Sequence, residues 1–294
     1  MRPEIAVLDI QGQHRVYTEF YRSETAEKTI VLVNGSLATT ASFAQTVRYL
    51  HPHFNVVLYD QPYAGQSKPH NLNHHPIRKE DEAAILLELI EHFAAEHVLS
   101  FSWGGAATLL ALAQRPRRIE KAILSSFSPL VNAAMRDYLE RGVQVLGACD
   151  RPGVGHLINS TIGKYLPSLF KRYNFRHVSS LAEHEYAQMH FHISEVLELI
   201  NAQYYTRCAD AIDIPTLFVN GEWDEYTTPE DARLFGTHLC KAQFRTIDNA
   251  GHFLDMEHKS ALQQTRDALL GFLQSTPSLA RPRPLAVESH ALAS

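Results

Sequence analysis

The segment HVLSFSWGGAATLLALA, residues 97–113, places a serine at the junction between a predicted buried strand and a predicted helix. The β-rich run ends at Ser102, and Gly104 and Gly105 open an alanine- and leucine-rich helix. A sharp strand-to-helix turn of this kind exposes a serine for nucleophilic attack, with the usual signature G-x-S-x-G. Ser100 stands here where that signature has its first glycine, and we expect so small a residue to be tolerated. The alternative is that Ser102 only caps the helix, a position that serine favours.

Apolar runs typical of buried strands alternate with helical patterns on both sides of this segment. The predicted strands are 28–35, 55–60, 97–102, 121–127, 215–221 and 243–248, and the predicted helices are 80–97, 104–116 and 258–274. Residues 4–22 alternate in polarity and turn at Gly12, which predicts an antiparallel hairpin. The whole pattern predicts an α/β fold with a mainly parallel sheet covered by helices on both faces.

The alternation stops between residues 129 and 212, where the pattern is helical and aromatic. Because this stretch lies between two predicted strands, we expect a helical lid inserted above the sheet. The predicted core is therefore 1–128 together with 213–275. The Pro- and Ala-rich residues 276–294 predict a disordered tail.

The composition is that of an ordinary globular protein and excludes several classes. The chain has 294 residues, 45% of them hydrophobic, and a net charge of −5, which argues against nucleic acid as a partner. No apolar stretch is long enough to predict a membrane span, and the first residues do not resemble a signal peptide. The three cysteines are widely spaced, which predicts free thiols in a reducing compartment and a cytoplasmic location.

Two further polar residues follow predicted strands and complete a possible triad with Ser102. Asp224 comes three residues after a strand-ending glycine, and His252 follows the last strand. Glu222 and Glu225 are rival acids, and each of these residues read alone is also compatible with an ordinary loop. The order serine, acid, histidine, each at the carboxyl end of a strand, is that of α/β hydrolases and differs from the orders in unrelated proteases.

An acyl-transfer site also needs donors for the oxyanion that nucleophilic attack creates. The backbone amide of Trp103 follows the nucleophile directly, and we predict it as one donor. The second candidate is the amide of Ser36, in the Asn-Gly-Ser turn after the strand 28–35. The alternative for this second stretch is a plain turn.

The sequence does not favour a metal or a resident cofactor. The histidines of the HNLNHHP loop lack the H-E-x-x-H pattern of zinc sites. The single G-x-G, at 153–155, follows no predicted strand and lacks the third glycine of nucleotide-binding folds. We therefore expect side chains alone to carry the chemistry.

Several stretches together resemble a known family: MRPEIAVLDIQGQ, LVNGSLATTASF, NVVLYDQPYAGQSKPHN, SFSWGGAATLLALA, GKYLPSLFKRYNFRHVSSL and NGEWDEYTTPEDAR. Over nearly the whole chain they are similar to the 3-hydroxyacyl-acyl-carrier-protein:CoA transacylases of pseudomonads, which supply monomers for polyhydroxyalkanoate synthesis. The TTASF, SWGG, DEYTT and GHFLD stretches also resemble the enzyme that joins two 3-hydroxyacyl units into the lipid half of rhamnolipids.

The resemblance implies an α/β-hydrolase fold with Ser102 as nucleophile, Asp224 as acid and His252 as base. It implies an (R)-3-hydroxyacyl substrate of about C10 on the phosphopantetheine of acyl carrier protein, with coenzyme A as acceptor substrate and no further cofactor. Serine at position 100 is shared by these relatives. Ala182 departs from the aspartate that similar transacylases carry five residues after the match to His177, which weakens any catalytic role of that histidine. Three alternatives remain: hydrolysis of the thioester, synthesis of a 3-hydroxyacyl dimer, and binding of lipid or carrier by an inactive hydrolase.

Residues 151–182 carry five basic side chains and no acid, in a chain whose net charge is negative. Aromatic and aliphatic residues are interleaved with them. Because acyl carrier proteins are acidic, such a surface would steer them toward the site. We predict that Lys171, Arg172 and Arg176 contact the carrier, the alternative being an ordinary solvated helix face.

Overall fold

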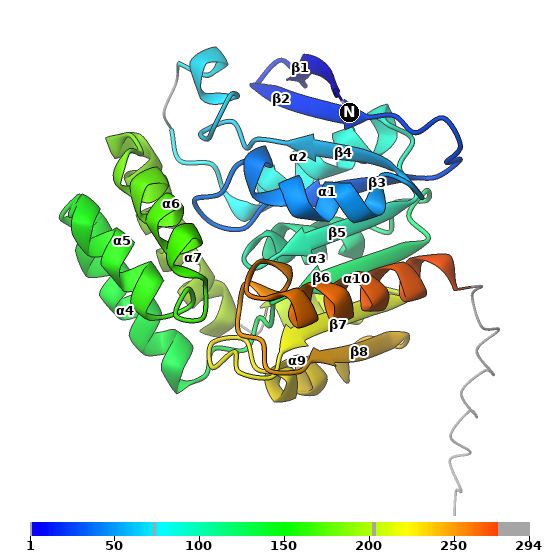
Figure 1. Ribbon diagram of the computed structural model, residues 1–294. Coiled ribbons are helices and arrows are strands. Elements are labelled where there is room, and N and C mark those ends of the chain that lie inside the picture. The colour runs from blue at the N-terminus through cyan, green and yellow to red at the C-terminus, as the bar shows by residue number, and fades with distance from the viewer. Residues whose placement is uncertain (1, 73–74, 202–203, 276–294) are drawn as a thin grey trace, which may run out of the picture.

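The computed structural model describes residues 2–72, 75–201 and 204–275, and within them one sheet of eight strands dominates (Figure 1). The strand order is β1-β2-β4-β3-β5-β6-β7-β8. The strands are β1 Glu4–Ile10, β2 His14–Tyr21, β3 Thr29–Val33, β4 Asn55–Tyr59, β5 His97–Phe101, β6 Lys121–Ser125, β7 Thr216–Gly221 and β8 Ala242–Ile247. The predicted disordered tail, 276–294, lies outside the described residues.

Only the β1 edge of the sheet is antiparallel. β1 and β2 form the predicted hairpin, β2 pairs antiparallel with β4, and every pair from β4 to β8 is parallel. β5 is central, with Ser100 opposite Val33 of β3 and Leu124 of β6. Because parallel strands end at one edge of the sheet, the loops that follow them meet there, where ligands of open α/β sheets bind.

Helices cover both faces of the sheet, as predicted. In Figure 1, α1 (Ala44–Leu50) and α10 (Lys259–Gln274) lie in front of it, and α2 (Lys79–His92) and α3 (Gly104–Ala113) lie behind. Ile30 and Leu32 of β3 pack into the core that includes α1 and α10. Val31 and Val33 pack into the opposite core with α2, α3 and α9 (Pro229–Gly236). A strand buried on both faces has few polar positions, which explains its continuous apolar run.

In the described part of the stretch between β6 and β7 there are five helices: α4 Ala133–Gly147, α5 Arg151–Ser160, α6 Ser168–Ser179, α7 Glu183–Asn201 and α8 Tyr204–Ala209. The first four form a group beside the sheet, drawn in green in Figure 1, and we call α4–α7 the helical insertion. The insertion has an apolar core of its own, which includes Leu139, Val154 and Tyr186. α8 instead packs into the core of the sheet through Tyr205 and Ala209.

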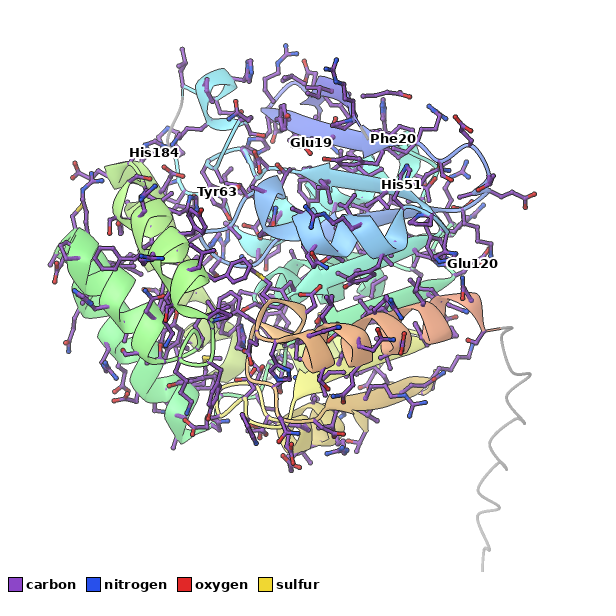
Figure 2. The ribbon with its side chains drawn as sticks, viewed as in Figure 1. Glu19, Phe20, His51, Tyr63, Glu120 and His184 are labelled. Carbon is purple, nitrogen blue, oxygen red and sulfur yellow. The ribbon has the colours of Figure 1, made fainter. Side chains whose placement is uncertain are left out.

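Buried polar contacts join the insertion to the sheet domain. Figure 2 shows Tyr63 where the two meet; its hydroxyl donates to Glu82 of α2 at 2.7 Å, and its ring meets the edge of His192 of α7. The side chain of Gln188 accepts from the amide of Ile77 and donates to its carbonyl, at 2.9 and 2.8 Å. These bonds fix where α7 sits over the ends of the strands.

The sequence patterns did not predict α1, α9 or the short 3₁₀ helices Thr40–Phe43, Lys68–His70 and Leu254–Met256. Among the described residues, the structure has no helix with the length and apolar character needed to cross a bilayer.

Candidate active site

Ser102 lies in the tight turn between β5 and α3. Its backbone has a φ of +51°, and its amide donates to the carbonyl of Ser125 at 2.9 Å. α3 starts so close to β3 that a Cβ at Gly104 would lie 2.4 Å from the Asn34 carbonyl oxygen, so only glycine fits there. The turn therefore has the geometry that the sequence predicted, although G-x-S-x-G is incomplete.

Ser100 is accommodated within the sheet. Its side chain is fully buried in β5, and its hydroxyl donates to the carbonyl of Ile123 on β6 at 3.4 Å. A buried hydroxyl is costly only when it has no partner, so this bond lets serine replace the usual glycine.

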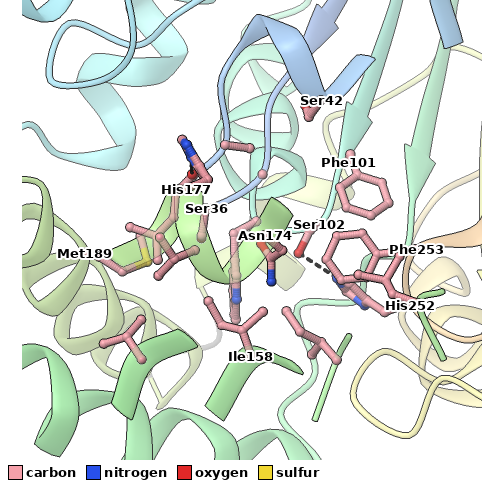
Figure 3. A pocket seen from close by; sticks show the side chains of 18 of the residues that line it. Ser36, Ser42, Phe101, Ser102, Ile158, Asn174, His177, Met189, His252 and Phe253 are labelled. Atoms are coloured by element: carbon pink, nitrogen blue, oxygen red, sulfur yellow. Dashed lines mark hydrogen bonds between the residues drawn. The ribbon is translucent and has the colours of Figure 1, made fainter. Parts of the chain in front are cut away.

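The three predicted side chains form one hydrogen-bonded row, drawn in part in Figure 3. His252 Nε2 lies 3.0 Å from Ser102 Oγ, and His252 Nδ1 lies 2.7 Å from Asp224 Oδ2. An ionised carboxylate only accepts hydrogen bonds, so Nδ1 carries the proton and Nε2 is free to accept one from the serine. The row therefore has the polarity needed to make Ser102 Oγ a nucleophile.

Asp224 is held as a charged acceptor. Besides His252, the amides of Tyr226 and Thr227 donate to Oδ1 at 3.0 and 3.2 Å, and the Thr227 hydroxyl donates to Oδ2 at 2.6 Å. Burial by itself raises the pKa of Asp224, but the charge of a protonated His252 and these donors outweigh it and lower that pKa. The sequence left Glu222 and Glu225 as rivals; they bind the Asn249 amide and Lys164 instead.

The loop that carries His252 is fixed by a residue that the sequence analysis missed. Glu257 accepts from the amides of Gly251 and Phe253, at 2.7 and 3.0 Å, on either side of the histidine. The rings of Phe101 and Phe253 pack edge-on against the imidazole. The GHFLDME motif contained this signal, because it places a carboxylate five positions beyond the histidine.

The two predicted oxyanion donors lie beside Ser102. Trp103 and Ser36 line the same cavity as Ser102, and a Cβ at Gly35 would lie 3.1 Å from Ser102 Cβ, so the two turns touch. Within the described part of the chain, neither amide donates to another backbone group. Both are thus free to bind a ligand oxygen.

A cavity of about 600 Å³ extends from Ser102 and His252 into the insertion. Its walls are mostly apolar, with residues from α4, α5, α6 and α7 facing the ends of the strands (Figure 3). Its lining residues include Met135, Leu139, Gly142, Leu157, Ile158, Met189 and Ile193. A volume of this size is typical of small-molecule sites.

The basic residues of 151–182 differ in their surroundings. Arg151 donates to the Leu181 carbonyl and Lys164 pairs with Glu225, so both are occupied within the protein. Lys171 donates to the Lys164 carbonyl at 2.7 Å, whereas Arg172 and Arg176 are exposed. Arg176 also lines the cavity, beside the partly exposed rings of Phe170 and Tyr173.

Other singled-out residues do not join the row. His177 lines the cavity, but its Nε2 lies 2.8 Å from the Leu37 carbonyl and bonds there. Among the residues that the structure describes, no three His, Cys, Asp or Glu side chains gather as a metal site would require.

The sheet, the sharp turn at Ser102 and the serine–histidine–aspartate row are those of serine-dependent α/β hydrolases. A family model described as alpha/beta hydrolase fold matches residues 28–259. The chain is 65% identical, over all of its length and all of the relative's, to a protein of Pseudomonas putida named (R)-3-hydroxydecanoyl-ACP:CoA transacylase. It is 66% identical to a protein of the same name from Pseudomonas aeruginosa, over 97% of this chain and 96% of that one. The chain therefore belongs to the α/β-hydrolase family and, within it, to the family of these transacylases.

Solved structures agree on the fold. The enol-lactonase of Burkholderia xenovorans superposes with a TM-score of 0.73 at 18% identity, covering 92% of this chain and all of the other. The bromoperoxidase of Bacillus anthracis gives a TM-score of 0.74, also at 18% identity, over 92% of this chain and all of the other. At this identity the likeness concerns the fold alone.

Proposed function

We propose that this protein transfers an (R)-3-hydroxyacyl group from acyl carrier protein to coenzyme A through an acyl-serine intermediate. The observation that carries the proposal is the row Ser102–His252–Asp224 at one end of an apolar cavity. The names of relatives 65–66% identical over nearly the whole chain supply the donor and the acceptor.

The first half of the reaction acylates the serine. His252 Nε2 takes the proton of Ser102 Oγ, which attacks the thioester carbonyl, and the amides of Ser36 and Trp103 hold the oxyanion. The tetrahedral intermediate collapses with cleavage of the carbon–sulfur bond. The proton on His252 passes to the leaving phosphopantetheine thiolate, so the carrier departs as a thiol.

The second half reverses these steps with another thiol. His252 removes the proton of the coenzyme A thiol, its sulfur attacks the acyl-serine, and the proton returns to Ser102 Oγ. Coenzyme A is thus a substrate, and we propose that no metal or resident cofactor takes part. The cavity is large enough for the acyl group. If each non-hydrogen group takes about 30 Å³, the volume of a water molecule in the liquid, a C10 hydroxyacyl chain fills roughly 350 Å³, which is less than the volume of the cavity.

The insertion serves, in this proposal, as a lid that excludes water and receives the carrier. Water would release a free acid from the acyl-serine, so transfer depends on its exclusion. We propose that Lys171, Arg172 and Arg176 attract the acidic carrier to the cavity mouth. The three free cysteines fit a cytoplasmic location.

Product analysis tests the proposal. The protein is incubated with (R)-3-hydroxydecanoyl carrier protein, with and without coenzyme A, and the products are separated by chromatography. We expect 3-hydroxydecanoyl-CoA, formed only when coenzyme A is present. Free acid at the same rate under both conditions would identify a thioesterase, and an ester-linked dimer would identify a synthase; either result contradicts transfer.

A further inference from the structure

Six residues of α4 line the cavity, and their spacing places them along one face of the helix. They are Met135, Tyr138, Leu139, Gly142, Val145 and Leu146. From the first to the last, a rise of about 1.5 Å per residue gives a wall roughly 16 Å long. An extended ten-carbon chain with bonds of about 1.5 Å is shorter than this, so this face of α4 is long enough to contact the chain along its whole length.

The N-terminal end of α4 is the end nearer to the triad. Its cap, Asn132, donates to the Glu225 carbonyl, next to Asp224, and the ring of Tyr138 packs on Tyr226. Residues further along α4 therefore lie further from the acid loop. Gly142 comes seven positions after Met135, which is about 10 Å along the helix axis.

Gly142 is unusual among the six wall residues because it has no side chain. It lies buried in the middle of a helix, where glycine is among the poorest helix formers. A Cβ at this position would lie 3.2 Å from Ile193 Cδ1 of α7, which also lines the cavity. Gly142 and Ile193 are therefore already in contact at the cavity wall, and a side chain added at position 142 has to displace Ile193 or extend into the cavity.

We propose that the pair Gly142 and Ile193 determines the acyl-chain length that the protein accepts. Added volume at position 142 narrows the cavity about 10 Å along α4 from Met135, so we expect long chains to lose their place while short ones do not reach the obstruction. Removing volume at position 193 opens the same point and admits longer chains. The inference rests on the proposed function, since it concerns the acyl group bound to Ser102.

The test is a chain-length profile. Release of the thiol from (R)-3-hydroxyacyl thioesters of six to fourteen carbons reports acylation of Ser102 whichever acceptor follows. In Gly142→Val we expect the ratio of kcat/KM for the ten-carbon chain to that for the six-carbon chain to fall about tenfold, the effect of one or two misplaced methylene groups. In Ile193→Ala we expect the maximum to move to longer chains.

The double variant Gly142→Ala/Ile193→Ala separates a specificity role from helix packing alone. If the two side chains share one space, the second substitution restores the profile that Gly142→Ala shifts, and the effects are not additive. Gly147→Ala is the matched control, because Gly147 ends the same helix but does not line the cavity. Its profile should superimpose on that of the wild type.

Profiles of equal shape in wild type, Gly142→Val and Ile193→Ala would overturn the inference, even if all rates fell together. If the wild type releases thiol from no thioester of the series, the proposed function fails, and the inference fails with it. These two failures are distinguishable, because the first leaves the wild type active.

Discussion

At the scale of single residues, the site depends on conformations that cost free energy. Ser102 adopts a φ of +51°, a region that costs a residue with a side chain about 1–3 kcal/mol. The same turn brings its Oγ within 3.0 Å of His252, and among the described residues the Trp103 amide has no backbone partner. The strain is thus located where exposure of the hydroxyl is needed.

Asp255 gives a prediction for pH. Burial raises the pKa of this carboxyl, although the hydroxyls of Tyr49 and Thr46 donate to it and lower that pKa in part. Because the pKa is raised in the folded state, the favourable contribution of Asp255 to the free energy of unfolding is complete below about pH 4. That contribution is lost as pH rises through the raised pKa. We expect Asp255→Asn, whose amide oxygen can still accept both bonds, to gain stability relative to wild type as pH rises from about 4 to 7.

Urea denaturation at a series of pH values measures this difference. Asp248→Asn, at an exposed position, serves as control and should follow the wild type. A free-energy difference between Asp255→Asn and wild type that stays constant over this range would contradict the assigned direction.

At the scale of elements, the sequence predicted the strands and helices that a local pattern of apolar and polar residues identifies. The strands β3, β5 and β7 are buried on both faces, so their continuous apolar runs identified them. α9 was missed because it is only eight residues long, too short for a clear helical period, although its threonine cap followed by proline is a typical helix start. The partner of the Ser100 hydroxyl lies on β6, a distant segment, so no local pattern contained it. Glu257 instead contacts amides four and six positions before it, within the GHFLDME motif, so that signal was present in the sequence and was missed.

The C-terminal end of α10 gives a prediction about stability. The buried amine of Lys121 donates to the carbonyls of Phe272 and Leu273 in the last turn of the helix, at 2.7 and 2.8 Å, and the Phe272 carbonyl also accepts from the amide and hydroxyl of Ser275. Lys121→Met keeps the apolar stem but removes the donor. We expect the free energy of unfolding to fall by about 1–3 kcal/mol.

Thermal and chemical denaturation check this value, with Lys259→Met at the exposed start of the same helix as the comparison. Equal stabilities for the two variants would show that Lys121 does not cap the helix.

At the scale of the whole molecule, the basic part of the insertion contrasts with a net charge of −5. Arg172 is exposed on α6, the helix that also brings Phe170, Tyr173 and Arg176 to the cavity mouth. We expect Arg172→Glu to raise KM for carrier-bound substrate several-fold relative to KM for a small pantetheine thioester. The effect should shrink at high salt, because exposed charges are screened.

Arg117→Glu changes the net charge equally but lies before β6, at the opposite end of the strands, so it is the matched control. If both variants raise the two KM values in the same proportion, α6 does not receive the carrier.

The most direct measurement concerns the acyl-serine on which the whole account depends. The protein is mixed with (R)-3-hydroxydecanoyl carrier protein without coenzyme A, quenched in acid, and analysed by intact and peptide mass spectrometry. We predict one 3-hydroxydecanoyl adduct on Ser102, lost on addition of coenzyme A with formation of its thioester, and no adduct in Ser102→Ala. An adduct on another residue, or undiminished transfer by Ser102→Ala, would contradict the mechanism.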